Sequence, residues 1–179
     1  MNRSAFDEKM NRTLLTTKQA SAAAKMPRPT FDRLSRRVTV PVVVGAGPGT
    51  AQIFTLRQMW VIAVCRAILD AGQPKEVATS VGRLLDGMTA DSIDTALQEG
   101  RGFVFVVRTA DASDPCPYLI RAEDISQTPE LMALKAAAEK KGFAVTYFGV
   151  DVGTILGQLI EAVDAAAKKA PQKRSSKKK

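Results

Sequence analysis

Histidine is absent from the 179 residues of the chain, and cysteine is scarce. Without histidine there is no Ser-His-Asp or Cys-His catalytic set and no histidine-ligated metal. The two cysteines, Cys65 and Cys116, allow at most one disulfide, which excludes a disulfide scaffold and favours a reducing, cytoplasmic setting. No pair of carboxylates has a spacing typical of general acid–base catalysis. We expect a protein that is not an enzyme and uses neither a metal nor a cofactor.

Long hydrophobic runs are also missing, since none approaches the ~20 residues of a membrane-spanning helix. The first twelve residues, MNRSAFDEKMNR, lack the apolar stretch of a secretory signal peptide. Aromatic residues make up only 6% of the chain, yet apolar residues reach 45%. This composition is sufficient for a folded core, so we expect a globular protein without a membrane segment.

The net charge of +8 is distributed unevenly along the chain. Residues 1–40 contain nine basic and three acidic side chains, and residues 168–179 contain seven basic and no acidic ones. Residues 89–167 have the opposite balance, six basic against twelve acidic. A basic head and tail can bind a polyanion, because each Lys or Arg near a phosphate releases a condensed counterion. The alternative is that these charges are solvated surface.

Two short helices are predicted near the N-terminus. Thr16 and Gln19 have the spacing of a capping box, and the helix that they begin should end near Met26, before Pro27. Pro29 suits the first turn of a second helix, TFDRLSRR. Its Phe31 and Leu34 mark a buried face. Three arginines of this helix lie largely away from that face: Arg33, Arg36 and Arg37.

A hairpin and two longer helices are expected to follow. The elements, in order, are a strand at 39–44, the turn GAGPGT, a strand at 51–55, a helix from Thr55 or Leu56 to Gly72, and a helix from Pro74 to Gly87.

The second half alternates strands and helices. We expect a short helix at 89–98, strands at 102–108 and within 116–124, a helix after Pro129 up to Gly142, a strand at 143–150, and a final helix at 153–169. Asp151, just before this last helix, is either its cap or a negative charge near its N-terminus. This order predicts a small mixed α/β layer. The apolar stripe of the final helix could cover this sheet or pair with a second copy of the chain.

The first half resembles the N-terminal winged helix-turn-helix of the MerR family. The resemblance covers roughly residues 13–88, in the stretches LLTTKQASAAAKMPRPTFDRLSRR and IFTLRQMWVIAVCRAILDAGQPKEVATSVGRLL. Thr30 and Phe31 stand where the family has a Thr-Leu pair at the start of its recognition segment. The residues that match after the wing are Phe54, Thr55, Ala71, Gly72 and Val77.

The chain also departs from the family's pattern. Arg33 and Leu34 replace the usual paired tyrosines, and the wing tip GAGPGTAQ has no basic residue to clamp phosphate. Residues 89–169 look like a mixed domain instead of the family's dimerising coiled coil. The cysteines of metal-sensing members are lacking beyond Cys65 and Cys116. The resemblance therefore implies a head that reads DNA, without the family's sensing chemistry.

Two alternative functions remain open from the sequence. An excisionase-type recombination accessory factor resembles the same winged head but bends DNA. The string VVVGAGPGTA resembles the glycine-rich turn of flavin- and nucleotide-binding proteins, in which a helix follows the turn at once. Here AQIFT reads as a strand, so we favour a wing tip.

The sequence thus predicts an α+β, sequence-specific transcription regulator that binds double-stranded DNA as a homodimer. We expect a flexible N-terminus at 1–12, a winged head at 13–88, an α/β dimerisation or effector domain at 89–169, and a disordered basic tail at 170–179. The side chains expected at DNA are Thr17, Lys18, Arg28, Thr30, Arg33, Arg36 and Arg37, with Arg28 and Arg33 at base edges. The tail residues expected at phosphates are Lys173, Arg174, Lys177, Lys178 and Lys179.

Overall fold

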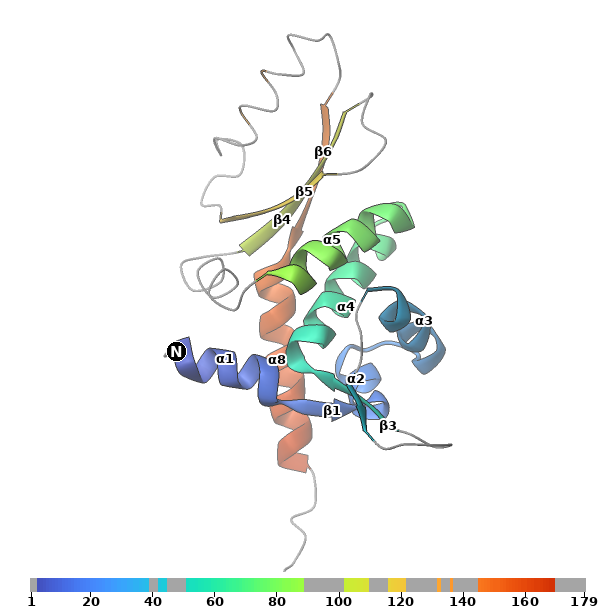
Figure 1. Cartoon of the computed structure of the whole chain (residues 1–179), viewed down its shortest axis with the longest axis vertical. Coiled ribbons are helices and arrows are strands. Elements are labelled where there is room, and N and C mark those ends of the chain that lie inside the picture. Colours follow the sequence, from blue (N-terminus) through green and yellow to red (C-terminus); the bar gives the residue numbers. More distant parts are fainter. Residues whose placement is uncertain are drawn as a thin grey trace, which may run out of the picture.

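The computed structural model describes residues 3–38, 42–44, 51–88, 102–109, 116–121, 132, 136 and 145–169 (Figure 1). Its elements are α1 (Arg3–Arg12), β1 (Leu14–Thr16), α2 (Thr17–Ala23), α3 (Arg28–Val38), β2 (Val42–Val44), β3 (Ala51–Thr55), α4 (Leu56–Asp70), α5 (Lys75–Gly87), β4 (Gly102–Thr109), β5 (Cys116–Arg121), β6 (Val145–Asp151) and α8 (Val152–Lys169).

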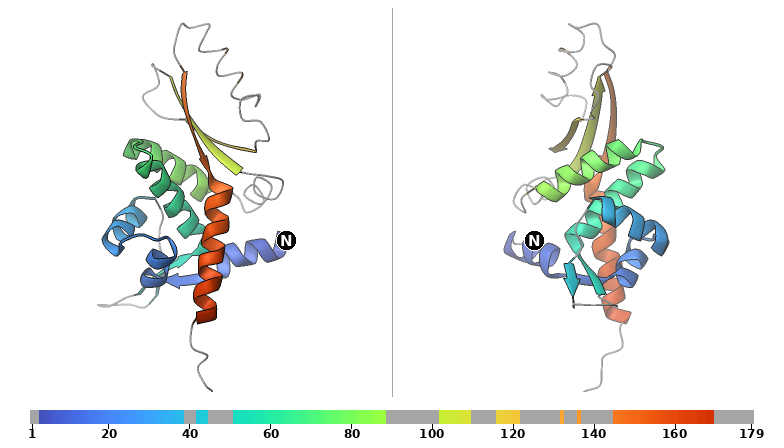
Figure 2. Two further views of the ribbon diagram at one scale, coloured as in Figure 1. Left: turned by 180° about the vertical axis from the view of Figure 1, so that it is seen from behind. Right: turned by 45° about the vertical axis from the view of Figure 1, so that its right-hand side comes forward.

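The strands form two antiparallel sheets, which lie at opposite ends of the helical layer (Figures 1 and 2). One sheet has the order β1-β3-β2, and in it Val43 faces Gln52 and Leu15 faces Phe54. The other has the order β5-β4-β6. Helices and antiparallel sheets together make this an α+β protein, as the sequence predicted.

Local sequence determines several helix ends. Thr16 and Gln19 form the expected capping box at the start of α2, and Thr55 and Gln58 form a second one at the start of α4. Each box satisfies backbone N–H groups that the first helical turn leaves without a partner. Gly72 ends α4 with a φ of 76°, a left-handed conformation that glycine adopts without steric cost.

The core forms around Trp60, which is fully buried on α4. Its indole N–H donates to the carbonyl of Val152 at 2.9 Å, joining residues 92 positions apart. Asp151 caps α8 at the same place, because its Oδ1 accepts from the N–H of Thr154 at 2.8 Å. The capping role expected of Asp151 is therefore confirmed.

The apolar stripe of α8 packs mainly against helices. Leu156, Leu159 and Val163 belong to the same core as Trp60, and α8 contacts α4, α2 and β4. Figure 2 shows α8 continuing from β6 and passing alongside α4. The expectation that the stripe covers the sheet is thus only partly correct. Its buried residues are occupied within the chain, so they are not available to pair with a second copy.

Two N-terminal elements correct the sequence analysis. Residues expected to form a flexible N-terminus contain α1, which contacts α4; Met10 is buried and Lys9 pairs with Asp164 on α8 at 2.9 Å. Strand β1 was also missed, because three residues carry no readable periodicity and only pairing with β3 makes them a strand. Helix α2 ends at Ala23, before the expected Met26.

Other expected elements lie outside the described residues. These are the helix at 89–98, the helix after Pro129 except residues 132 and 136, the turn at 45–50 and the tail at 170–179. Within the part of the chain that the structure describes, no helix has both the length and the hydrophobicity needed to cross a bilayer.

Two helical glycines give a matched test of packing. A Cβ added at Gly82 would lie 2.9 Å from Cys65 Sγ and 3.1 Å from Val38 Cβ, whereas one at Gly157 would meet nothing within 4 Å. Alanine improves helix propensity by about 1 kcal/mol at either position.

We therefore expect Gly157→Ala to stabilise the protein by about 0.5–1 kcal/mol. Gly82→Ala should destabilise it by about 1–2 kcal/mol, because overpacking outweighs the propensity gain. Urea unfolding followed by circular dichroism measures both. Equal stabilisation by the two variants would contradict the close packing at Gly82.

Candidate nucleic-acid interface

Helix α3 has one buried and one exposed face. Its buried residues are Phe31, Leu34, Ser35 and Val38. The Phe31 ring packs edge-on against Phe54, with 5.0 Å between centroids and 81° between planes. This packing fixes α3 against β3, which leads directly into α4.

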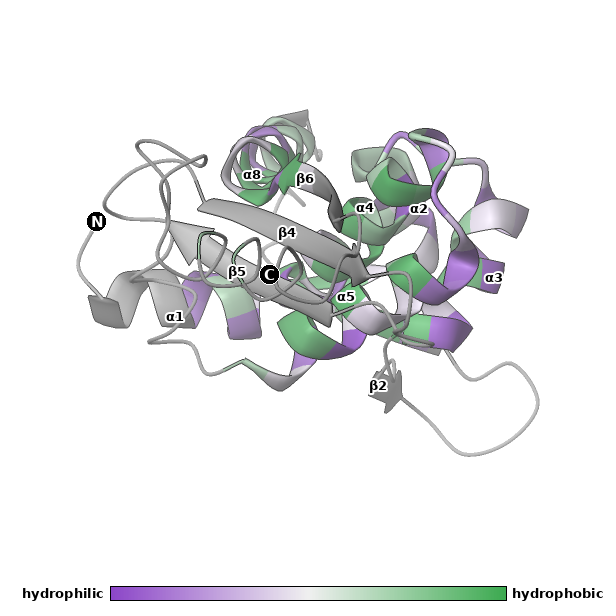
Figure 3. Ribbon diagram, turned by 90° about the horizontal axis from the view of Figure 1, so that it is seen from above, coloured by the Kyte–Doolittle hydropathy of each residue, from purple (hydrophilic) through white to green (hydrophobic). Residues whose placement is uncertain are grey.

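The three expected arginines of α3, Arg33, Arg36 and Arg37, are all exposed. Figure 3 shows hydrophilic positions along the outer side of this helix. None of the three makes an ion pair with any residue within the described ranges. Arginine side chains without an internal partner remain available to bind an anion.

The two other expected residues of α3 differ in environment. Arg28 is the first residue of the helix; its side chain is 70% exposed and its Nε lies 3.7 Å from Asp32 Oδ2. Thr30 is half-buried, and its N–H donates to the carbonyl of Pro27 at 3.0 Å. Arg28 therefore reaches solvent, and Thr30 helps to form the first turn.

Helix α2 carries the remaining two residues expected at DNA. Thr17 Oγ1 donates to the carbonyl of Gln52 on β3 at 3.4 Å, whereas Lys18 is exposed. Thr17 thus links α2 to the sheet, and Lys18 presents its charge to solvent.

The turn between α2 and α3 closes with a Schellman motif. The N–H of Lys25 donates to Ala22 at 3.1 Å, and the N–H of Met26 donates to Ser21 at 2.9 Å. Lys25 has a φ of 50°, which is left-handed for a residue other than glycine. Buried Met26 then anchors the turn before α3 begins.

A hollow of about 230 Å³ brings some of the predicted residues together. Thr30, Arg33 and Arg37 line it from α3, and the structure adds Arg66 and Lys75 from the chain near the α4–α5 turn. No carboxylate lines this hollow, so an anion is favoured there. Sequence reasoning missed Arg66 and Lys75, because nothing in their local pattern indicates that they face α3.

Acidic neighbours partly offset two of these charges. Arg66 Nη2 lies 2.6 Å from Asp70 Oδ1, and Lys75 lies 3.7 Å from Glu76. Arg33 and Arg37 have no such partner among the described residues, so they contribute the uncompensated charge.

The remaining candidate sites are the basic tail, a metal site and the glycine-rich turn. The expected tail contacts, Lys173, Arg174, Lys177, Lys178 and Lys179, lie outside the described residues. Among the residues that are described, no group of three His, Cys, Asp or Glu side chains could hold a metal ion. Strands β2 and β3 on either side of the glycine-rich turn pair antiparallel.

Comparison with models of known protein families gives no match, and comparison with curated proteins gives none either. A MerR-like head therefore stays a prediction from the quoted residues and their order in the sequence.

Burial controls the chemistry of Cys65. Its side chain is fully buried, and Sγ donates to the carbonyl of Ala78 at 3.1 Å. Burial raises the pKa of this thiol to about 12, because the thiolate would lose its hydration. The folded protein therefore keeps Cys65 protonated and unreactive at neutral pH.

We expect Cys65 to react with a disulfide reagent at pH 8 only in the unfolded protein. A Cys116→Ser variant leaves Cys65 as the one thiol of the chain, so the measured reaction is that of Cys65. The raised pKa contributes stability that is complete below the pKa of the unfolded thiol, near 9, and is lost as the pH rises toward 12. Thiol release measured against urea concentration checks this. Rapid labelling of the native variant would contradict the burial of Cys65.

Proposed function

We propose that the protein is a sequence-specific DNA-binding transcription regulator. In this proposal α2, its turn and α3 act as a helix-turn-helix, with α3 as the recognition helix in the major groove. Strands β2 and β3 flank the wing, which touches the DNA backbone beside that groove. No catalytic step and no cofactor are part of this function.

The exposed arginine face of α3 is the observation that carries the proposal. A recognition helix needs a buried stripe that fixes its orientation and long donors on the opposite side. Phe31 and Leu34 supply the stripe, and Arg33, Arg36 and Arg37 supply the donors. Because α3 also packs against α4, the arginines project from a rigid frame.

The hollow beside α3 adds support. Arg66 and Lys75, each beside a carboxylate, place further N–H donors next to Arg33 and Arg37. A DNA phosphate entering this hollow would meet donors from α3 and from the α4–α5 region at once. Phosphate contacts of this kind set orientation on the duplex, whereas contacts to base edges set sequence preference.

The antiparallel pairing of β2 and β3 weakens the nucleotide-binding alternative. A dinucleotide-binding turn leads from a strand directly into a helix whose N-terminus holds the pyrophosphate. Here the turn leads into β3, and the helix begins only at Leu56. This order favours a wing over a flavin or nucleotide site.

A homodimer is part of the proposal because a single small head makes few contacts to DNA. Two heads related by a two-fold axis would read two half-sites. The dimer contact would use surface other than the occupied stripe of α8. Light scattering at micromolar concentration tests the dimer, and a monomer would refute it.

Arg33→Ala should weaken binding to a selected operator by about 1–3 kcal/mol if Arg33 reads a base. Arg83→Ala is the matched control, since Arg83 is an exposed arginine on α5 that does not line the hollow beside α3. Sites are first selected from random duplex DNA, and affinity is then measured by fluorescence anisotropy at constant salt.

The ratio of operator affinity to random-DNA affinity decides the role of Arg33. A fall confined to Arg33→Ala supports base reading, and an unchanged ratio in both variants contradicts it. Absence of DNA binding by the full chain at low salt would refute the whole proposal. Strong bending of an array of sites would favour the excisionase-type alternative.

Deleting residues 170–179 should reduce the salt dependence of DNA binding. The deletion removes the five basic residues expected at phosphates, and each phosphate contact contributes about 0.9 to the slope of log K against log salt. With only some contacts formed at once, we expect a drop of about 2–4 in slope. The operator-to-random ratio should stay nearly constant, and identical slopes would show that the tail does not contact DNA.

A further inference from the structure

The hollow beside α3 combines apolar residues with four cationic side chains. Leu34 of α3, which is buried, and Leu69 of α4, which is half-buried, are its apolar residues. The cationic residues come from α3, α4 and α5; they are Arg33, Arg37, Arg66 and Lys75. Apolar surface beside a charge lowers the local dielectric constant, so these cations attract an anion more strongly here than on an open surface.

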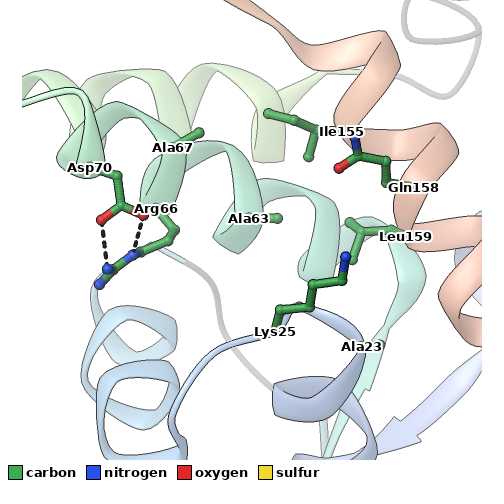
Figure 4. Close-up of a pocket in the computed structure, with 10 residues that line it drawn as sticks. Ala23, Lys25, Ala63, Arg66, Ala67, Asp70, Ile155, Gln158 and Leu159 are labelled. Atoms are coloured by element: carbon green, nitrogen blue, oxygen red, sulfur yellow. Dashed lines mark hydrogen bonds and ion pairs between the residues drawn. The ribbon is translucent and has the colours of Figure 1, made fainter.

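Asp70 orients Arg66 at the edge of this hollow. Figure 4 shows their two contacts: Arg66 Nε donates to Asp70 Oδ2 at 2.6 Å, and Arg66 Nη2 lies 2.6 Å from Asp70 Oδ1. The N–H groups of Nη1 take no part in this fork and remain for another acceptor. Asp70 does not line the hollow beside α3; it lines the separate hollow of Figure 4, which Arg66 also borders. Arg66 therefore brings directed N–H donors to the hollow beside α3, while the pair has no net charge.

Helix α5 begins at the same hollow. Lys75 is its first residue, and its N-cap residue is Pro74, whose side chain cannot accept from the helix. The N–H groups of a first helical turn carry a partial positive charge and favour an anion. The Lys75 ammonium lies 3.7 Å from the Glu76 carboxylate, which offsets part of its charge. The start of α5 thus adds to the attraction without adding a full charge.

The uncompensated charge of the hollow belongs to Arg33 and Arg37. Neither forms an ion pair within the described residues, whereas Arg66 and Lys75 each have a carboxylate beside them. A phosphodiester of DNA carries a single negative charge, but a phosphate monoester carries about 1.5–2 negative charges at neutral pH and has an additional acceptor oxygen. Two unpaired arginines therefore match a phosphate monoester better than a phosphodiester.

We propose that this hollow binds a small phosphate monoester, with the phosphate held by Arg33, Arg37 and the Nη1 edge of Arg66. The volume of about 230 Å³ leaves room for a compact organic group, since a cavity of about 150 Å³ accommodates benzene. Because Arg33 and Arg37 are also expected at DNA, a bound monoester excludes a DNA phosphate from them and weakens DNA binding. This competition rests on the proposed DNA-binding function, whereas binding of the monoester does not.

Methyl phosphate is the probe, and dimethyl phosphate, which carries a single charge, is the matched control ligand. Both are titrated into the full chain without DNA, at constant ionic strength and about pH 7.5, where methyl phosphate is largely a dianion. We expect saturable ¹H–¹⁵N NMR shifts at Thr30, Arg33, Arg37 and Lys75, with methyl phosphate bound about two- to fivefold more tightly, the range of an exposed ion pair. Absence of saturable shifts at these residues, or equal affinity for the two ligands, overturns the proposal.

Three arginine variants of α3 locate the bound phosphate. Arg33→Gln and Arg37→Gln each remove a cation from the hollow and should weaken methyl phosphate binding about two- to fivefold. Arg36→Gln is the matched control, since Arg36 is exposed on the same helix but does not line the hollow, and it should leave the affinity unchanged. Circular dichroism verifies that the variants are folded. An equal loss in Arg36→Gln, or no loss in Arg33→Gln and Arg37→Gln, overturns the proposal.

Competition with DNA is measured separately, by fluorescence anisotropy of a labelled duplex. Methyl phosphate should release the protein from the duplex at concentrations at which dimethyl phosphate, at the same ionic strength, does not. Saturable methyl phosphate binding without such release overturns the competition. Absence of DNA binding by the protein refutes the proposed function and the competition together, and the NMR titration then decides the monoester site by itself.

Discussion

The hydrogen bond from Trp60 to the carbonyl of Val152 joins the two halves of the described chain. Trp60 is buried, so this N–H requires a partner within the protein. Val152 begins α8, and Asp151 caps the helix and is also the last residue of β6. One buried contact thus fixes where α8 starts, how it runs past α4, and where the β5-β4-β6 sheet is attached.

The same helix α4 supports the proposed DNA-binding face. Its N-terminus follows β3, on which Phe54 meets the ring of Phe31. Burial of Phe31 orients α3, and this orientation places Arg33 and Arg37 beside Arg66. The exposed charges therefore depend on an apolar contact on the opposite side of α3.

Small residues have two opposite effects around α4. Gly82 of α5 allows close approach, since a Cβ there would clash with Cys65 and Val38. Ala63 and Ala67 lie beside α8 and leave a cavity. Helices α4 and α3 approach α5 closely at Gly82, whereas α4 and α8 leave a hollow between them at Ala63 and Ala67.

Local sequence accounts for the elements whose cause lies within a few residues. The capping box at Thr16 and Gln19, the end of α4 at Gly72, the hairpin strands and the two faces of α3 all follow from local spacing. Tertiary structure alone decided the partner of the α8 stripe, the pairing of β1, the docking of α1, and the meeting of Arg66 and Lys75 with α3. Periodicity shows which face of a helix is buried, but the residue that covers that face depends on side-chain shapes from distant parts of the chain.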